Sequence, residues 1–159
     1  MIKVLFVCHG NICRSPMAEF IMKDLVKKQG LSDKFIIESR ATSTEAIGCS
    51  VYPPAKRKLL EHGLSCNGKT AKQITKSDYL HFDYIILMDK INLRNFSRVI
   101  GEDTDNKVSL LMDFTERPGE VSDPWYTDDF ETTYIDILEG CSGFLDKVMK
   151  QGIQYEQKY

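Results

Sequence analysis

A cysteine, an arginine and a serine stand close together near the start of the chain, in Cys8-His9-Gly10-Asn11-Ile12-Cys13-Arg14-Ser15-Pro16. An apolar, strand-like stretch ends at Cys8, and the Ser-Pro pair favours the start of a helix. Backbone N–H groups of a short loop and of a helix N-terminus converge on an anion. Arg14 adds a planar guanidinium that matches two phosphoryl oxygens, and the same positive field favours the thiolate form of Cys8. This segment predicts a phosphate-binding loop that contains a nucleophile.

A buried structural cysteine is the simpler interpretation of Cys8, because free cysteine is among the most buried residue types. Arg14 argues against this interpretation, since a cation near an inert thiol would need another partner. Gly10 also suits a loop whose N–H groups turn inward. The loop is not a nucleotide-binding P-loop, because no Gly-Lys-Ser/Thr sequence closes it. We therefore predict that Cys8 is catalytic.

A carboxylate that could complete this chemistry, Asp123, lies far along the chain in Asp123-Pro124-Trp125-Tyr126. A carboxylic acid held beside a leaving oxygen supplies its proton, an effect worth about 10²–10⁴-fold. Its carboxylate can then take a proton from the water that cleaves a cysteinyl phosphate. Pro124 restrains the preceding residue towards an extended conformation. An ordinary surface Asp-Pro turn is the favoured interpretation of Asp123 when it is considered alone.

The chain resembles the low molecular weight protein tyrosine phosphatases. The resemblance rests on the loop at Cys8, on the distal Asp123-Pro124 pair, and on weaker matches at 38–42, 82–89 and 92–94. Cys-x5-Arg alone occurs in unrelated phosphatases, but Cys-x5-Arg-Ser near the N-terminus with a distal Asp-Pro is much more specific. The resemblance implies that Cys8 is the nucleophile, that Arg14 binds phosphate and stabilises the transition state, and that Asp123 is the general acid and base.

Two walls are expected around the pocket. Trp125 and Tyr126, next to the acid, are predicted to form one wall and to stack on a phenyl phosphate. The alternative for Trp125 is a place in the core, and the family more often has two tyrosines here. The opposite wall is expected after Ser39, with Glu45 where relatives often carry an aromatic residue. Glu45 would disfavour acidic residues beside the target tyrosine, or it is a solvated loop residue without a role.

The resemblance also implies supporting roles for Asn11, Ser15 and Ser39. In the family the loop Asn is held by a Ser of the second strand and commonly by a His, and the loop Ser donates a hydrogen bond to the thiolate. We expect Asn11 to contact Ser39, and Ser15 to contact Cys8, although Ser15 could also be a simple helix cap. The family His would fall at 67–69, where this chain reads Asn-Gly-Lys. The network must therefore be satisfied differently.

Three further residues have an expected role. Cys13, as in relatives, is expected to trap an oxidised Cys8 as a reversible disulfide; the alternative is a small apolar residue that faces the first helix. His9 is expected at the edge of the loop, where an imidazolium would add to the positive field. Asp89 is predicted to cap a helix behind the site. No role is assigned to the remaining cysteines, which are Cys49, Cys66 and Cys141.

Strand-like and helix-like segments alternate along the chain, which indicates a parallel sheet with helices on both faces. We expect strands at 2–7, from 35–37, at 84–88 and at 108–112, and helices at 16–29, 53–60, 93–100 and 133–150. Ser15 is the expected N-cap of the first helix, and Gly30 and Gly63 are expected to end the first two helices. Ligands of such sheets bind at the carboxyl ends of strands, where Cys8 lies. The resemblance sharpens this to a three-layer, flavodoxin-like fold with a four-stranded sheet.

Length, charge and cysteine content limit the classes of protein to which this chain can belong. The 159 residues predict a single domain over residues 1–159. The net charge of -2 gives no general attraction to nucleic acid or to an anionic membrane. No apolar stretch reaches membrane-spanning length, and Cys8 and Arg14 interrupt the only apolar run near the N-terminus. Five cysteines without CxxC pairs favour reduced thiols in the cytoplasm. No metal or cofactor is expected, because Arg14 and the loop amides supply the positive charge.

The sequence therefore predicts a phosphomonoesterase that acts on tyrosine-phosphorylated proteins and small aryl phosphates and binds inorganic phosphate or other oxyanions in its loop. A thiol-dependent arsenate reductase would need two further cysteines, and Cys66 alone fits poorly. A protein-arginine phosphatase is a second alternative, but it typically has Thr where Ile12 stands. A non-catalytic phosphotyrosine-binding module would need neither a thiolate nor an acid.

Overall fold

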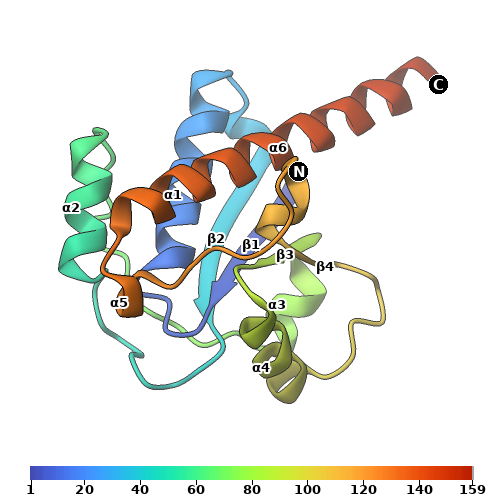
Figure 1. Cartoon of the computed structure of the whole chain (residues 1–159). Coiled ribbons are helices and arrows are strands. Elements are labelled where there is room, and N and C mark those ends of the chain that lie inside the picture. The colour runs from blue at the N-terminus through green and yellow to red at the C-terminus, as the bar shows by residue number, and fades with distance from the viewer. Residues whose placement is uncertain (159) are drawn as a thin grey trace.

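A parallel sheet of four strands forms the centre of the computed structural model, which describes residues 1–158 (Figure 1). The strand order is β2-β1-β3-β4. The bounds are Ile2–Cys8 for β1, Phe35–Ala41 for β2, Tyr84–Leu87 for β3 and Val108–Leu110 for β4. Every pairing is parallel, and the order is that of the flavodoxin-like folds. The predicted fold class is confirmed.

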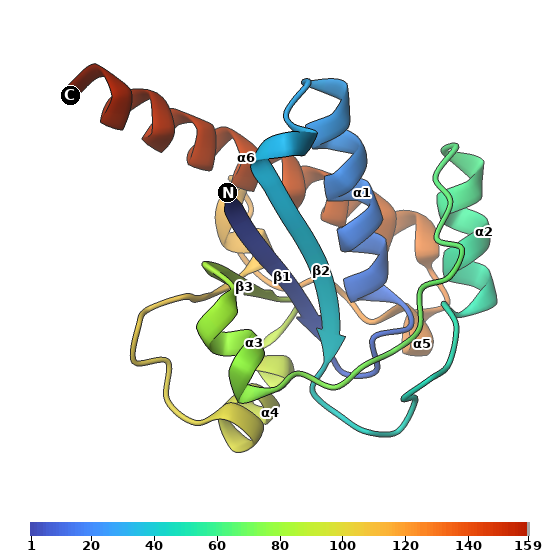
Figure 2. The same cartoon turned by 180° about the vertical axis from the view of Figure 1, so that it is seen from behind.

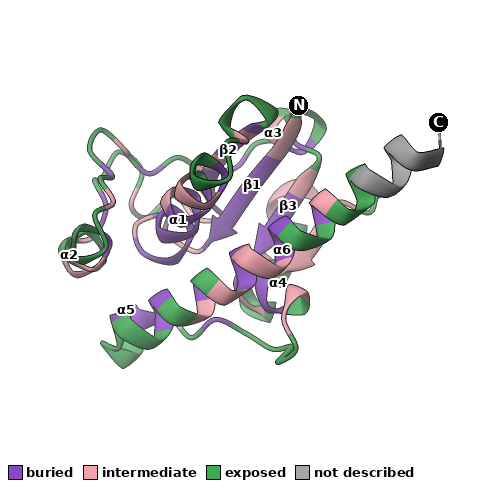
Figure 3. Cartoon of the chain, turned by 90° about the horizontal axis from the view of Figure 1, so that it is seen from above, coloured by how far each residue is buried: buried purple, intermediate pink, exposed green. Residues whose placement is uncertain are grey.

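Helices cover both faces of the sheet, as Figures 1 and 2 show. On one face lie α1 (Arg14–Lys28), α2 (Pro53–Glu61) and α6 (Phe130–Lys158). On the other lie α3 (Lys76–His81) and α4 (Lys90–Ile100). Figure 3 shows the buried strands between these layers. No helix among residues 1–158 combines the length and the apolar character that a membrane crossing requires.

The alternation of side chains along β1 explains why the thiol points where it does. Val4, Phe6 and Cys8 belong to the core beneath α1 and α6, whereas Leu5 and Val7 belong to the core beneath α3 and α4. This is the period of two that any strand imposes. Cys8 therefore leaves the end of β1 on the side of α1, where the next helix can reach it.

The position of Cys8 is also the point where the strand order reverses. From the central strand β1 the chain passes to β2 on one side and later to β3 on the other. Crevices form outside the carboxyl ends of parallel strands at such a switch point. The topology therefore opens a crevice where the sequence places the nucleophile.

Two boundary predictions around the loop are wrong. β1 runs one residue further than predicted, because Cys8 still pairs with Ala41 of β2. α1 begins at Arg14, with Cys13 as an N-cap that makes no side-chain bond, so Ser15 is not the predicted cap. The Ser15 hydroxyl contacts Cys8 instead. Gly30 follows the helix with φ 69, a left-handed conformation that glycine adopts readily.

Other elements differ from the predictions through side-chain caps and local pairing. α4 begins at Lys90, because Asp89 and Asn92 form a capping box at its start; the predicted role of Asp89 as a cap is confirmed. α3 was missed, although Thr75 and Asp78 form the same motif. β4 ends at Leu110, where the 3-10 helix η2 (Leu111–Phe114) takes over. α6 is longer than predicted at both ends, and η1 (Ser32–Lys34) is a further short 3-10 turn.

Candidate active site

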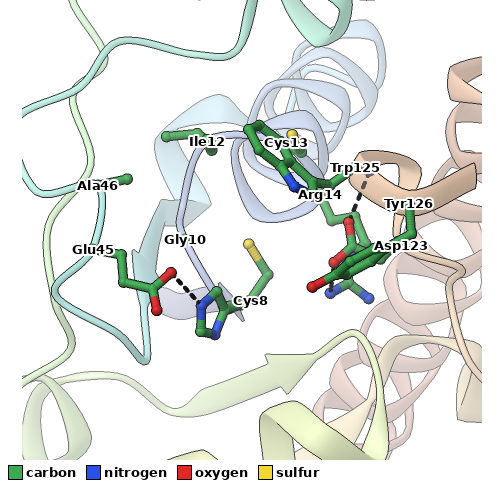
Figure 4. Close-up of a pocket in the computed structure, with 11 residues that line it drawn as sticks. Cys8, Gly10, Ile12, Cys13, Arg14, Glu45, Ala46, Asp123, Trp125 and Tyr126 are labelled. Atoms are coloured by element: carbon green, nitrogen blue, oxygen red, sulfur yellow. Dashed lines mark hydrogen bonds and ion pairs between the residues drawn. The ribbon is translucent and has the colours of Figure 1, made fainter. Parts of the chain in front are cut away.

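A pocket of about 310 Å³ opens at the carboxyl end of β1 (Figure 4). Three segments that are far apart in the sequence supply its walls: the loop after β1, the segment after β2, and the turn before α6. The lining residues are Cys8, His9, Gly10, Ile12, Cys13, Arg14, Glu45, Ala46, Asp123, Trp125 and Tyr126. The fold therefore brings the predicted nucleophile, arginine and acid to one cavity.

The sulfur of Cys8 lies over the first turn of α1. The backbone N–H of Ser15 points at Sγ over 3.4 Å, and the Ser15 hydroxyl oxygen lies 3.0 Å from it. A helix N-terminus stabilises negative charge, so this position favours a thiolate. The left-handed residue of the loop is Asn11, with φ 58, and not Gly10. Asparagine tolerates this conformation better than most residues.

Arg14 is held by three residues that belong to two other segments. Its side chain is only 3% exposed. Nη1 donates to Asp89 Oδ2 at 2.6 Å and to the Val121 carbonyl at 2.8 Å, and Nη2 donates to Asp123 Oδ2 at 3.4 Å. Burial opposes the charge of Arg14, but Cys8, Asp89 and Asp123 outweigh it and raise the pKa of the guanidinium. Arg14 is therefore a fixed cation.

These contacts decide which face of the guanidinium meets the pocket. The two protons of Nη1 are used by Asp89 and Val121, and one proton of Nη2 is directed to Asp123. Within the described part of the chain, the Nε proton and the second Nη2 proton remain for a ligand. The edge of a guanidinium that carries Nε and Nη2 has the geometry that binds two oxygens of a phosphoryl group.

Asp123 is fixed at the start of a short helix, α5 (Pro124–Thr127). Its Oδ1 accepts the Trp125 N–H at 3.0 Å, which makes it the N-cap of that turn. The chain before it is tied to the sheet, because the Val121 N–H donates to the Met88 carbonyl at 2.9 Å. Asp123 therefore reaches the pocket with one oxygen in a cap and the other directed towards Arg14.

The aromatic residues after the acid lie on the pocket wall, as expected. Trp125 is 56% exposed and Tyr126 84% exposed, so the alternative of a core tryptophan is wrong. The Trp125 ring packs on Tyr52, with 4.9 Å between centroids. Trp125 belongs to the single turn of α5.

His9 and Glu45 meet on the opposite side of the pocket (Figure 4). Nε2 of His9 lies 2.9 Å from Oε2 of Glu45. His9 was predicted at the edge of the loop and Glu45 on the second wall, with no contact expected between them. The contact joins the phosphate loop to the segment after β2.

A buried polar network lies behind the loop and contains the expected contacts. Nδ2 of Asn11 donates to Ser15 Oγ at 2.8 Å and to Ser39 Oγ at 2.9 Å. The side-chain oxygen of Asn11, Oδ1, accepts the backbone N–H of Lys72 at 3.2 Å, which fixes the orientation of the side-chain amide. Ser39 in turn donates to Glu19 Oε1 at 2.6 Å.

Lys69 stands where the family histidine was expected. Its Nζ lies 3.1 Å from Glu19 Oε1 and donates to the Ser39 carbonyl at 3.0 Å. Burial disfavours the ionised form of both residues. The pKa of Glu19 is nevertheless lowered, because Lys69, Lys23 and Ser39 outweigh burial, whereas burial lowers the pKa of Lys69 despite Glu19. We take Glu19 to be ionised, because three donors surround it.

The direction of each hydrogen bond in this network follows from the ionised Glu19. A carboxylate only accepts, so Ser39 must donate to it and accept from Asn11. Asn11 then donates its other proton to Ser15. The Ser15 hydroxyl proton is left for Cys8 at 3.0 Å or for the Arg40 carbonyl at 3.4 Å. The shorter contact directs this proton to the sulfur, where it stabilises a thiolate.

Cys13 lines the same pocket as Cys8. Burial, with the negative charges of Cys8 and Asp123, raises the pKa of the Cys13 thiol to about 12. Cys13 is therefore a neutral thiol beside a position that favours a thiolate. Cys49, Cys66 and Cys141 lie outside the pocket lining.

Among the residues whose side chains the structure describes, one group of possible metal ligands occurs, formed by Glu61, His62 and Glu131 on the surface. Lys58 already supplies a positive charge there, because its Nζ lies 2.8 Å from Glu61 and 2.6 Å from Glu131. His62 stacks on Tyr134 with 3.9 Å between centroids. These contacts describe a surface ion-pair cluster outside the pocket.

Sequence reasoning missed several groups at the site. Asp89 was predicted only as a cap, and nothing local indicated its contact with Arg14. Glu19 and Lys69 had no predicted role, and the Val121 carbonyl carries no side-chain signal at all. The missing family histidine at 67–69 was the one available hint of Lys69.

Comparison with known proteins gives one consistent result. The family model described as "Low molecular weight phosphotyrosine protein phosphatase" matches residues 3–154. A curated relative of that name from Sus scrofa is 42% identical over 151 residues, which are 91% of this chain and 94% of the relative.

Two solved structures are similar in fold as well as in sequence. YfkJ from Bacillus subtilis is 38% identical, with a TM-score of 0.91 over 95% of this chain and 96% of its own. A structure described as "DARP, drosophila arginine phosphatase" is 34% identical, with a TM-score of 0.84 over 92% of this chain and 98% of its own.

Proposed function

This chain belongs to the low molecular weight phosphotyrosine protein phosphatase family, and we propose that Cys8, Arg14 and Asp123 are the residues with which it hydrolyses phosphotyrosine. The observation that supports this assignment is their convergence on one pocket (Figure 4). The sulfur, the free side of the guanidinium and a carboxylate surround a space that accepts a phosphoryl group.

The first step forms a cysteinyl phosphate. The thiolate of Cys8 attacks phosphorus, and the bond between phosphorus and the tyrosine oxygen breaks. Asp123 gives its proton to that oxygen, so that the leaving group departs as a neutral phenol. Arg14 and the loop N–H groups hold the non-bridging oxygens while negative charge moves through the transition state.

The second step regenerates the enzyme. The Asp123 carboxylate takes a proton from water, and the resulting hydroxide attacks phosphorus. The sulfur–phosphorus bond breaks and returns the thiolate, which Ser15 stabilises. Inorganic phosphate leaves, and Asp123 is again protonated for the next cycle. This sequence uses only groups of the chain and water.

We assign tyrosine-phosphorylated proteins and small aryl phosphates as substrates, with inorganic phosphate and other oxyanions as ligands of the loop. The exposed aromatic wall at Trp125 and Tyr126 supports an aryl leaving group. We also assign residues 1–159 to one domain. Five free cysteines support a reducing compartment such as the cytoplasm.

Arginine phosphatase activity is the second candidate, because one similar structure bears that description. Ile12 lines the pocket where Thr is typical of that activity, so we favour phosphotyrosine. The test compares turnover of phosphotyrosine, phosphoserine and phosphoarginine peptides, and of arsenate with thioredoxin, by one preparation. Preferential release of phosphate from phosphoarginine, or reduction of arsenate, would contradict the assignment.

Replacement of Arg14 by lysine should lower kcat by at least about 10²-fold, nearly as much as replacement by alanine. An ammonium has three protons and no fixed fork, so it does not satisfy Asp89, Val121, Asp123 and a phosphoryl group together. Arg40→Lys, at a half-buried arginine outside the pocket lining, is the matched control. Steady-state kinetics that show near-normal Arg14→Lys turnover would exclude the proposed role.

Peroxide should inactivate the enzyme reversibly and link Cys8 to Cys13. The Cys8 thiolate is oxidised to a sulfenic acid, and the Cys13 thiol displaces water to form the disulfide. Oxidation also neutralises Cys8, which removes one cause of the raised pKa of Cys13. Mass spectrometry should recover the linked pair, and dithiothreitol should restore activity. Wild-type enzyme that accumulates Cys8 sulfinic acid without the linked pair would refute protection by Cys13.

A further inference from the structure

Glu45 lies at the edge of the pocket, opposite the aromatic wall (Figure 4), and its carboxylate contacts the His9 ring. The side chains of His9 and Glu45 are 45% and 75% exposed. A phosphotyrosine whose ring lies against Trp125 and whose phosphate lies over Cys8 leaves its neighbouring residues at the pocket edge. The pair is therefore within reach of residues that flank the phosphotyrosine.

One carboxylate oxygen of Glu45 is available to bind such a residue. His9 uses Oε2 of Glu45, and among the described residues no donor lies on Oε1. The other charged or titratable residues that line the pocket are Cys8, Cys13, Arg14, Asp123 and Tyr126. Arg14, the other cation among them, is buried against Asp89 and Asp123. Glu45 is thus the carboxylate most open to a substrate cation.

We propose that the His9–Glu45 pair makes this enzyme select phosphotyrosines with basic neighbours, and that this selectivity increases with pH. The proposal rests on the function assigned above to Cys8, Arg14 and Asp123. Histidine changes its charge between about pH 5 and 8. A cationic His9 neutralises Glu45, so the pair has no net charge. Beside a neutral His9 the Glu45 carboxylate keeps an uncompensated negative charge, which attracts Lys or Arg and repels Asp or Glu.

The test uses two phosphotyrosine peptides that differ only in having Lys or Glu on both sides of the phosphotyrosine. The readout is the ratio of their kcat/KM values, Lys peptide over Glu peptide, at about pH 5.5 and at about pH 7.5. Both peptides react with the same catalytic groups of the enzyme, so effects common to the two reactions cancel in the ratio. We expect about one at the lower pH and about three- to tenfold at the higher pH, the size of exposed charge pairs.

Two variants distinguish the contribution of Glu45 from that of His9, and a third variant is the control. Glu45→Gln should abolish the preference at the higher pH and favour the Glu peptide at the lower pH, where His9 is an unpartnered cation. His9→Gln should show the higher ratio at both pH values. Asp33→Asn removes an exposed carboxylate just before β2 starts, at the opposite end of the sheet, and should retain the wild-type ratios.

A wild-type ratio of about one or less at the higher pH would overturn the proposal. A ratio that stays the same in Glu45→Gln as in the wild type would also overturn it. A Lys preference of equal size at both pH values would overturn the role of His9. These outcomes require turnover of at least one peptide. Failure of the assigned function looks different, since neither phosphotyrosine peptide would then be hydrolysed.

Discussion

Replacement of Cys8 by serine should lower phosphotyrosine turnover by about 10⁴-fold or more, to the limit of detection. A serine hydroxyl is a far weaker acid than a thiol, so it stays a neutral alcohol at a position that favours the Cys8 thiolate. The Ser15 N–H, the Arg14 fork and the loop remain in the variant. It should therefore still bind inorganic phosphate, which calorimetry and a raised melting temperature would detect.

The matched control is Cys49→Ser, which makes the same chemical change at an exposed thiol outside the pocket lining. This variant should retain wild-type turnover. Substantial hydrolysis by Cys8→Ser would remove Cys8 from the mechanism. Loss of both turnover and phosphate binding, with normal melting in buffer alone, would mean that the thiol builds the loop rather than attacking phosphorus.

Replacement of Asp123 by alanine should slow phosphoenzyme formation by about 10²–10⁴-fold for phosphotyrosine. The tyrosine oxygen has a pKa of about 10, so it leaves poorly without a proton. Aryl phosphates of much more acidic phenols leave unaided and should lose less. The variant should therefore depend more steeply on the leaving-group pKa than the wild type, and its pH profile should lose the limb set by an acid.

Single-turnover rates of phosphoenzyme formation are the proper measurement, because chemistry must limit the observed rate. Asp128→Asn is the matched control, since Asp128 ends the same short helix and lies outside the pocket lining. Equal losses across the whole phenol series in Asp123→Ala would show that Asp123 shapes the loop through its cap on Trp125. The acid would then have to be another carboxylate.

Much of the fold could be predicted, because its signals are local. The buried strand residues at 85–87 form a continuous apolar run, and alternation of strands and helices leads to a parallel sheet. The errors lie at element ends and in α3, a short helix that was missed. Ser15 was a plausible cap by type, but the sulfur at the end of β1 takes its hydroxyl. The preference of serine for helix N-caps takes no account of a hydrogen-bond partner from a distant segment.

The loop itself could be predicted because one strand end, one short turn and one helix start confine Cys8 and Arg14 to the same place. The family resemblance alone joined Asp123 to them, since nothing local relates the two segments. The groups that hold Arg14 from behind were not predicted. Asp89 lies 75 positions from it in the sequence, and Val121 lies 107 positions away.

By itself the sequence determined the chemistry: a thiol and a guanidinium around one anion site, and a fold class that places this site at a strand end. The tertiary structure decided how that chemistry is supported. It paired Lys69 with Glu19 in place of a histidine, and it joined His9 to Glu45. The physical reason is the range of the forces. Backbone preferences act over a few residues, whereas ion pairs and buried hydrogen bonds depend on which distant segments the sheet order brings together.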